Sequence, residues 1–299
     1  MNERLAKAVL PLRRVFACVL PSSPGVIATF VLCSVAFAQS SADPQELVRQ
    51  AVGNELASPF LPDNCSYQYH REGSGRHETL LMVKSSDLVV GKLVRINNAP
   101  PSRDQEQKEN DRLRRLLHDS DLQQQQRRKQ QKFEHYVREL VAALPQAFHY
   151  TETETEAAAD GRRLIHLAFQ PAPDFHPATT ELELLRGMAG AMVIDDQRKR
   201  IVRLAAHTFR EMDFGWGLLI HLNKGANLLL EREAAPRLGF DLRAFSVTIE
   251  GRILLLKKLE VHWSFDHFAS LGRTVDLASA VGLLTAPDLA GSGPGLLSH

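Results

Sequence analysis

The 12 histidines of this sequence are the residues best suited to chemistry, because an imidazole can bind a metal ion or transfer a proton near neutral pH. They are dispersed along the chain, and no H-E-x-x-H or H-x-H motif occurs. The closest group is His262, Asp266 and His267. On a regular β-strand His262 and Asp266 share one face while His267 points to the other, so these three ligands do not converge. We therefore predict neither a metal site nor a bound cofactor.

The sequence also lacks a pattern for nucleophilic or acid–base catalysis. It holds no G-x-S-x-G motif, and the glycines of Gly215-Trp216-Gly217 do not form a phosphate loop. Asp195 and Asp196 could act as paired carboxylates. They lie in a polar turn, however, where Asp is favoured because its side chain hydrogen-bonds to nearby backbone amides. We predict that the protein is not an enzyme.

The first forty residues have the order of a secretory signal peptide. A basic segment that ends at Arg13-Arg14 precedes the apolar stretch Gly25–Val35, and Ala36-Phe37-Ala38 matches a cleavage pattern. The uninterrupted apolar stretch is shorter than the ~20 residues of a membrane-spanning helix, which favours cleavage over an anchor. We predict that residues 1–38 are a signal peptide and that the protein is exported.

Composition and charge limit the classes of partner. The chain of 299 residues is 44% hydrophobic and has a net charge of +1, so a nucleic-acid partner is not expected. Cys65 is the only cysteine outside the predicted signal peptide, which rules out an internal disulfide and a C-x-x-C site. We expect Cys65 to be a buried, inert thiol.

The remaining chain alternates in the manner of β-strands, with a few helices inserted. A short helix is expected after Asp43, and a long helix begins at Ser102, where Gln105 completes a capping box. The polar middle of that helix, His118–Lys132, is either a solvated stretch or a break into two helices. Strands are expected at 66–71, 78–83, 88–96, 148–156, 164–169, 190–194, 201–209, 216–223, 226–233, 242–250 and 253–265. Because the helices interrupt a meander of strands and do not alternate with them, the pattern indicates an antiparallel α+β fold.

One block of hairpins resembles a known family. The hairpin Gly190–Asp196 is followed by Ile201-Val202-Arg203-Leu204 and later by Lys224-Gly225. This order resembles the outer-membrane lipoprotein-sorting (LolA/LolB-like) superfamily, and more closely its uncharacterised exported bacterial branch. The resemblance extends over Ala42–Phe268 and rests on structural signatures of hairpins, not on catalytic motifs. The charged, Gln-rich insertion Arg103–Lys132 departs from the family pattern, as does the C-terminal tail.

The resemblance implies one domain over residues 39–271, with a helical insertion at about 102–144. The composition of residues 272–299, rich in Ala, Gly, Pro and Ser, indicates a weakly ordered tail. Its fold would be a strongly curved antiparallel sheet, an incomplete β-barrel, with helices covering the concave side. In the lipoprotein carriers that concavity shelters acyl chains from water. The resemblance also implies a periplasmic location and transient contact with a membrane.

Apolar side chains are the best indication of a ligand site. Leucines occur on both faces of successive strands, as in Leu218-Leu219 and Leu228-Leu229-Leu230. One face could pack on helices while the other lines a cavity, although the same side chains would equally well fill a two-sided core. The predicted ligand-binding residues are Met188, Met192, Phe209, Met212, Phe214, Trp216 and Leu219.

We therefore expect a non-enzymatic periplasmic protein that binds a lipid, a lipoprotein acyl chain or another hydrophobic ligand, with the helices as a lid. The alternative is a non-catalytic interaction module that binds another protein of the cell envelope through the charged helix 102–144. Deletion of Arg103–Lys132 would discriminate between the two, because only the interaction module needs the charged surface to bind its partner.

Overall fold

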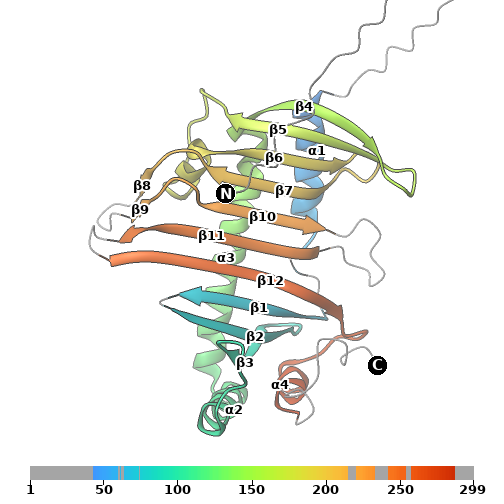
Figure 1. Cartoon of the computed structure of the whole chain (residues 1–299). Coiled ribbons are helices and arrows are strands. Elements are labelled where there is room, and N and C mark those ends of the chain that lie inside the picture. The colour runs from blue at the N-terminus through green and yellow to red at the C-terminus, as the bar shows by residue number, and fades with distance from the viewer. Residues whose placement is uncertain are drawn as a thin grey trace, which may run out of the picture. The chain divides into compact units, whose positions relative to one another are not determined.

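The computed structural model describes residues 43–59, 61, 64–73, 75–214, 220–232, 242–253 and 257–286. The predicted signal peptide lies outside these residues. The described part of the chain is an α+β structure built on one antiparallel sheet of 12 strands that does not close into a barrel (Figure 1). The predicted fold class, an open curved antiparallel sheet with helices, is confirmed.

The strands are β1 (Cys65–Gly73), β2 (Arg76–Lys84), β3 (Val89–Ile96), β4 (Phe148–Ala157), β5 (Arg163–Pro171), β6 (Met188–Asp195), β7 (Arg200–Thr208), β8 (Met212–Phe214), β9 (Ile220–Leu222), β10 (Asn227–Arg232), β11 (Leu242–Ile253) and β12 (Lys257–Ser270). The helices are α1 (Pro44–Ala57), α2 (Arg103–His118), α3 (Ser120–Ala147), the short 3-10 helix η1 (Glu181–Gly187) and α4 (Leu277–Thr285). Of these, the sequence analysis did not anticipate β8, η1 and α4.

The sheet has the strand order β3-β2-β1-β12-β11-β10-β7-β6-β5-β4, with β8 and β9 paired to each other beside β11. Most neighbours are hairpins of consecutive strands. The exceptions are the pairings of β10 with β7, of β9 with β11 and of β1 with β12, the last of which places Cys65 opposite Ser270. The sheet is therefore completed by a contact between the two ends of the described chain, a pairing that no local sequence pattern specifies.

Helices α1 and α3 pack on one face of the sheet, which we call the concave face. The core there is made by Leu47 and Val48 of α1, Leu144 of α3, and inward residues of the strands such as Phe169 and Met192. All five side chains are buried. The Asp43 carboxylate caps α1 by accepting a hydrogen bond from the Gln45 amide at 3.1 Å, as the sequence predicts.

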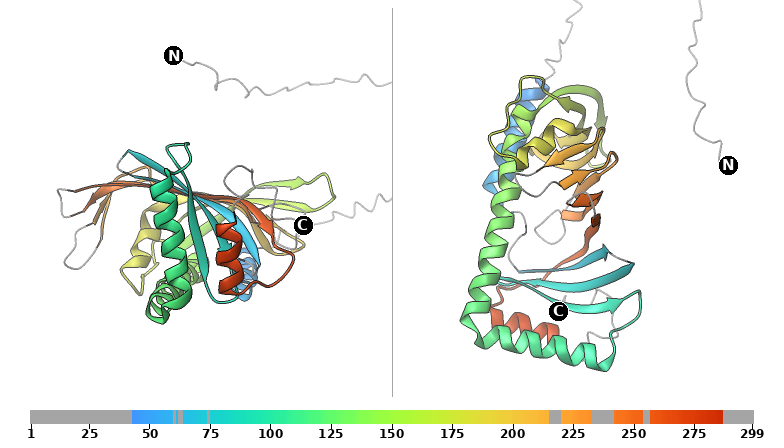
Figure 2. Two further views of the ribbon diagram at one scale, coloured as in Figure 1. Left: turned by 90° about the horizontal axis from the view of Figure 1, so that it is seen from below. Right: turned by 90° about the vertical axis from the view of Figure 1, so that its left-hand side faces the viewer.

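Helices α2 and α4 form a second core with β2 and β3. Leu113 and Leu116 of α2 and Val281 of α4 pack there against Val83 and Val90. Figure 2 shows α3 running along one side of the sheet, while α2 and α4 lie together at the end that holds β3. Since successive strand residues alternate between faces, the β2 and β3 residues of this second core lie on the face opposite to α1 and α3. We call this opposite face the convex face.

The predicted long helix is two helices, because the chain turns at Asp119. The capping box at its start is present: the Ser102 amide donates to the Gln105 side chain at 2.8 Å, and the Gln105 amide donates to the Ser102 hydroxyl at 3.3 Å. The Asp119 carboxylate then caps α3 by accepting from the Asp121 and Leu122 amides, each at 3.0 Å. Both alternatives for the polar middle hold in part, since a break is followed by a largely exposed stretch of helix.

Glutamines of this polar stretch pair with the edge of the sheet. Gln126 donates to the Val89 carbonyl at 3.1 Å, and Gln130 accepts from the Val89 amide at 3.0 Å. Glu109 of α2 likewise accepts from the Leu93 amide at 3.0 Å. β3 is an edge strand, so the backbone amides and carbonyls on its outer side could pair with a strand of another molecule. The side chains of Gln126, Gln130 and Glu109 bond to some of these groups and so hinder such pairing.

The expectation of a weakly ordered tail is wrong for Leu277–Thr285, which form α4. Asp276 caps this helix by accepting a hydrogen bond from the Ser279 amide at 2.7 Å, and Ala280, Val281 and Leu284 are buried in the second core. The composition of the segment suggested a loose appendage, because its apolar residues pack against α2, β2 and β3, which are distant in the sequence. Residues 287–299 lie outside the described chain.

Candidate functional site

The concave face carries one continuous row of apolar side chains. Residues placed directly opposite each other in the strand registers point to the same side of the sheet, and one such line crosses nine strands from β5 to β3. We call this line the apolar row. In spatial order it consists of Leu167, Met192, Leu204, Leu230, Phe245, Phe265, Tyr69, Leu80 and Leu93.

Helices cover one end of the apolar row. Leu167 and Met192 are almost fully buried in the core beneath α1 and α3. Next along the row, Leu204 and Leu230 line a pocket of about 140 Å³ between the sheet, the end of α1 and the later part of α3. The helices contribute Leu56, Val137, Val141 and Leu144 among other residues to this pocket. The pocket therefore opens where the packed core gives way to the rest of the row.

Beyond the pocket the row is aromatic and partly exposed, before it ends at Leu80 and Leu93. The ring of Tyr69 stacks on that of Phe265 with centroids 4.9 Å apart, and Phe245 lies 5.6 Å from Phe265 on the next strand. All three side chains keep part of their surface accessible to solvent. On α3, Phe133 lies one turn before the pocket residue Val137, and its side chain is 42% exposed. Apolar surface thus continues on the sheet beyond the pocket and on the helix that borders it.

A charged cluster borders the pocket. Glu55 at the end of α1 accepts hydrogen bonds from Arg200 at 3.0 Å, from Arg232 at 2.6 Å and from the Ile201 amide at 3.1 Å. Burial alone would raise the pKa of Glu55. Hydrogen bonds and charge from Arg232 and Arg200 outweigh that effect and hold the pKa of Glu55 below its usual range. The pocket therefore combines apolar walls with an ionised rim, which suits an amphiphilic ligand better than a purely apolar one.

Four of the seven residues predicted to bind ligand have described side chains, and these four lie in different surroundings. Met188 and Met192 are buried in the core of the concave face. Met212 is also buried, and its side chain packs directly against Gly187. Phe209 is 40% exposed, and Arg210 lies over its ring. The side chain of Phe214 and the whole of Trp216 and Leu219 lie outside the described part of the protein. Of the four whose side chains the structure describes, Met188, Met192, Phe209 and Met212, none lines the pocket between α1, α3 and the sheet.

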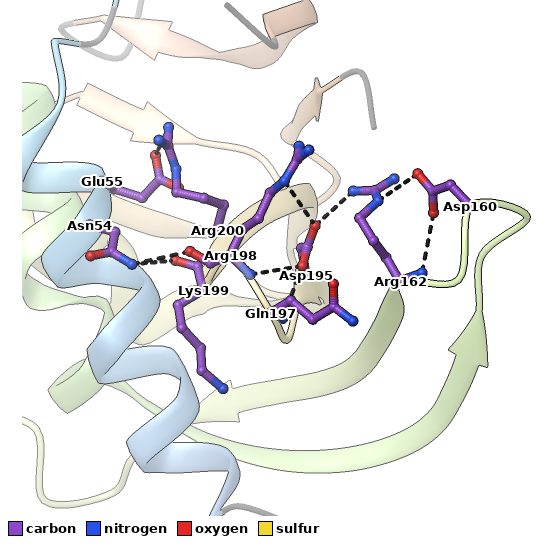
Figure 3. A network of polar contacts seen from close by, with 9 residues as sticks. All are labelled: Asn54, Glu55, Asp160, Arg162, Asp195, Gln197, Arg198, Lys199 and Arg200. Atoms are coloured by element: carbon purple, nitrogen blue, oxygen red, sulfur yellow. Dashed lines mark hydrogen bonds and ion pairs between the residues drawn. The ribbon is translucent and has the colours of Figure 1, made fainter. Parts of the chain in front are cut away.

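Asp195 and Asp196 have separate structural tasks. The Asp195 side chain, only 1% exposed, accepts from the amides of Gln197 and Arg198 at 3.0 Å each and from Arg162 at 2.7 Å (Figure 3). The Asp196 carboxylate instead bonds to Lys199 at 2.7 Å and to Arg163. The two carboxylates therefore do not face a common substrate position, and the predicted turn role describes Asp195 well.

Sequence reasoning missed the aromatic part of the row. Tyr67 and Tyr69 alternate along one strand, and Trp263 and Phe265 along another, which is the sequence signal of a shared apolar face. That signal cannot show that these two strands are neighbours. Their adjacency arises from the pairing of β1 with β12, which lie almost two hundred positions apart in the numbering.

The comparisons with known proteins add no assignment. No family model, no curated protein and no solved structure matches this chain. Among the described helices, none combines the length and the apolar character that crossing a membrane requires.

Proposed function

We propose that this protein is an exported, non-enzymatic carrier that binds the acyl chain of a lipid or lipoprotein along its concave face. The observation that supports this most directly is the apolar row, which runs from the core through the pocket to the partly exposed ring of Phe265. The resemblance to the lipoprotein-sorting superfamily supports the same function, and a periplasmic location belongs to the same proposal.

The length of the row sets the energetic scale. Neighbouring strands lie about 4.8 Å apart, so the four intervals from Leu204 to Tyr69 span roughly 19 Å. An extended acyl chain advances about 1.3 Å per carbon, so this distance accommodates a chain of roughly 15 carbons. Because each buried CH₂ contributes about 0.8 kcal/mol, removal of two carbons is expected to weaken binding about fifteen-fold.

The experiment measures the uptake of the fluorescent fatty acid cis-parinaric acid by the delipidated protein, followed by displacement with saturated fatty acids of 10 to 16 carbons. We expect saturable binding and a displacement constant that rises about fifteen-fold for each two carbons removed. A folded, delipidated protein that takes up no probe would show that side chains fill the concave face, and the proposal would fail.

Two matched variants locate the site. Phe133→Asp replaces the partly exposed ring beside the pocket with a charged side chain, and we expect it to weaken probe binding at least ten-fold. Phe209→Asp introduces the same change at a ring of similar exposure that follows β7 and is not on the helix that borders the pocket, and binding should stay within two-fold of the wild type. The reverse result would move the site to the residues predicted from the sequence.

The alternative function, an interaction module that uses the charged helices, remains a prediction, and the structure changes its test. Deletion of Arg103–Lys132 would remove Leu113 and Leu116 from the second core as well as the glutamines that pair with β3. The double variant Arg128→Glu/Lys129→Glu keeps these contacts because both residues are exposed on α3. A lipid carrier should take up cis-parinaric acid equally well with this variant, whereas an interaction module should lose the binding of its partner protein.

A further inference from the structure

A β-bulge on the convex face gathers side chains that the sequence analysis predicted to be apart. The register between β1 and β12 shifts between Ser66 and Gln68. As a result, His267 and Phe268 of β12 together lie opposite the single residue Tyr67 of β1. His267 adopts a φ of +52°, in the left-handed region. Its side chain is thereby turned toward Asp266, and the prediction that the two point in opposite directions is wrong.

The bulge brings together two imidazoles and one carboxylate. The Asp266 Oδ1 atom lies 2.6 Å from Nδ1 of His267 and 3.0 Å from Nε2 of His70, which comes from the neighbouring strand β1. Each of the three residues offers one ligand atom that lies within 4.8 Å of those of the other two. His262, the third member of the group expected from the sequence, instead bonds to Thr248 at 2.7 Å.

A buried hydroxyl orients one of the imidazoles. Thr79 on β2 is 3% exposed, and its Oγ1 atom lies 3.1 Å from Nδ1 of His70. When Nδ1 donates its proton to this oxygen, the lone pair of Nε2 points toward Asp266. A hydrogen bond of this kind at the second ring nitrogen is the usual support of a metal-binding histidine.

We propose that His70, Asp266 and His267 bind one divalent transition-metal ion, with Zn²⁺ as the best fit. Two imidazoles and a carboxylate suit Zn²⁺ better than Ca²⁺ or Mg²⁺, which require more oxygen ligands. Ligands bound at about 2.0 Å to a tetrahedral ion lie roughly 3.3 Å apart, so small side-chain rotations satisfy this geometry. The three protein ligands leave a fourth position for water.

Such an ion would connect β1 to β12, the one sheet pairing that joins the two ends of the described chain. It would lie directly behind the apolar row, because Phe265 precedes Asp266 and projects to the concave face. Its expected role is therefore to stabilise the sheet beneath the aromatic part of the row. The inference does not depend on lipid binding, since it concerns the other face.

The experiment is a calorimetric titration of the untagged, chelator-treated protein with Zn²⁺, together with thermal unfolding in the presence and absence of the ion. We expect one equivalent to bind and the unfolding midpoint to rise. Asp266→Asn and His70→Gln should each weaken binding at least ten-fold and abolish the shift of the midpoint. His267→Asn should do the same while retaining the backbone, because Asn tolerates the left-handed conformation.

His207→Gln is the matched control, because His207 is an exposed histidine of the same face on β7. Zn²⁺ affinity should be unchanged in this variant. The proposal is overturned if the folded wild type binds no Zn²⁺. It is also overturned if the folded His267→Asn variant binds as tightly as the wild type.

Discussion

The turn between β6 and β7 provides a sharp test of how buried polar groups stabilise this fold. Asp195 is almost fully buried, accepts two backbone hydrogen bonds within the turn, and pairs with Arg162, whose side chain is 8% exposed (Figure 3). Asp195→Ala removes these three interactions and a longer ion pair with Arg198 at 3.9 Å, and it leaves a buried guanidinium with Asp160 as its remaining ion-pair partner among the described residues. Loss of one member of a buried ion pair typically costs about 3–5 kcal/mol. We expect the free energy of unfolding to fall by that amount.

The replacement Asp195→Asn separates the two contributions. An amide oxygen can still accept the backbone hydrogen bonds of the turn, whereas the charge-assisted bond to Arg162 is lost. Hydrogen bonds to charged groups contribute about 1.5–3 kcal/mol, so the Asn variant should lose roughly half as much stability as the Ala variant.

Urea unfolding at pH 7, followed by circular dichroism, measures these differences by linear extrapolation. Asp196→Asn is the control at the adjacent position, where the partners are more exposed, and it should cost at most about 1 kcal/mol. The reasoning is refuted if Asp195→Ala lies within about 1 kcal/mol of the wild type. It is refuted equally if the Asn and Ala variants are destabilised to the same extent.

Two further predictions concern the packing and charge of the concave face. Gly190→Ala would place a methyl group against the Ala205 carbonyl and 2.9 Å from the ring of Phe169, so we expect a loss of about 1–3 kcal/mol in the same urea assay. Gly53→Ala, in α1 with nothing within 4 Å, should instead stabilise by about 0.5–1 kcal/mol, and similar effects of the two changes would contradict the packing argument. Because the pKa of Glu55 is lowered in the folded state, its stabilising contribution is present above its unfolded pKa of about 4.3 and disappears as the pH falls through the folded value. The stability difference between wild type and Glu55→Gln should therefore shrink on acidification from pH 7, and a difference that is independent of pH would exclude this account.

Local features of the chain could be predicted because their physical causes lie within a few residues. Asp43 caps α1 and Ser102 with Gln105 caps α2, since the side chains bond to amides two or three positions away. Alternating apolar residues predicted most of the strands for a similar reason. The same reasoning failed for α4, because the helix depends on apolar partners that are distant in sequence.

The sequence by itself determined the α+β class, the antiparallel sheet, the caps of α1 and α2 and the role of Asp195 in a turn. Only the tertiary structure decided which apolar side chains share a surface, because the apolar row and the His70–Asp266–His267 cluster both depend on the pairing of β1 with β12. A single bulge also reversed the direction of His267, and no strand periodicity contains that information. Contacts between distant segments depend on register and on backbone conformation together, whereas the local pattern of residue types records only which face each side chain prefers.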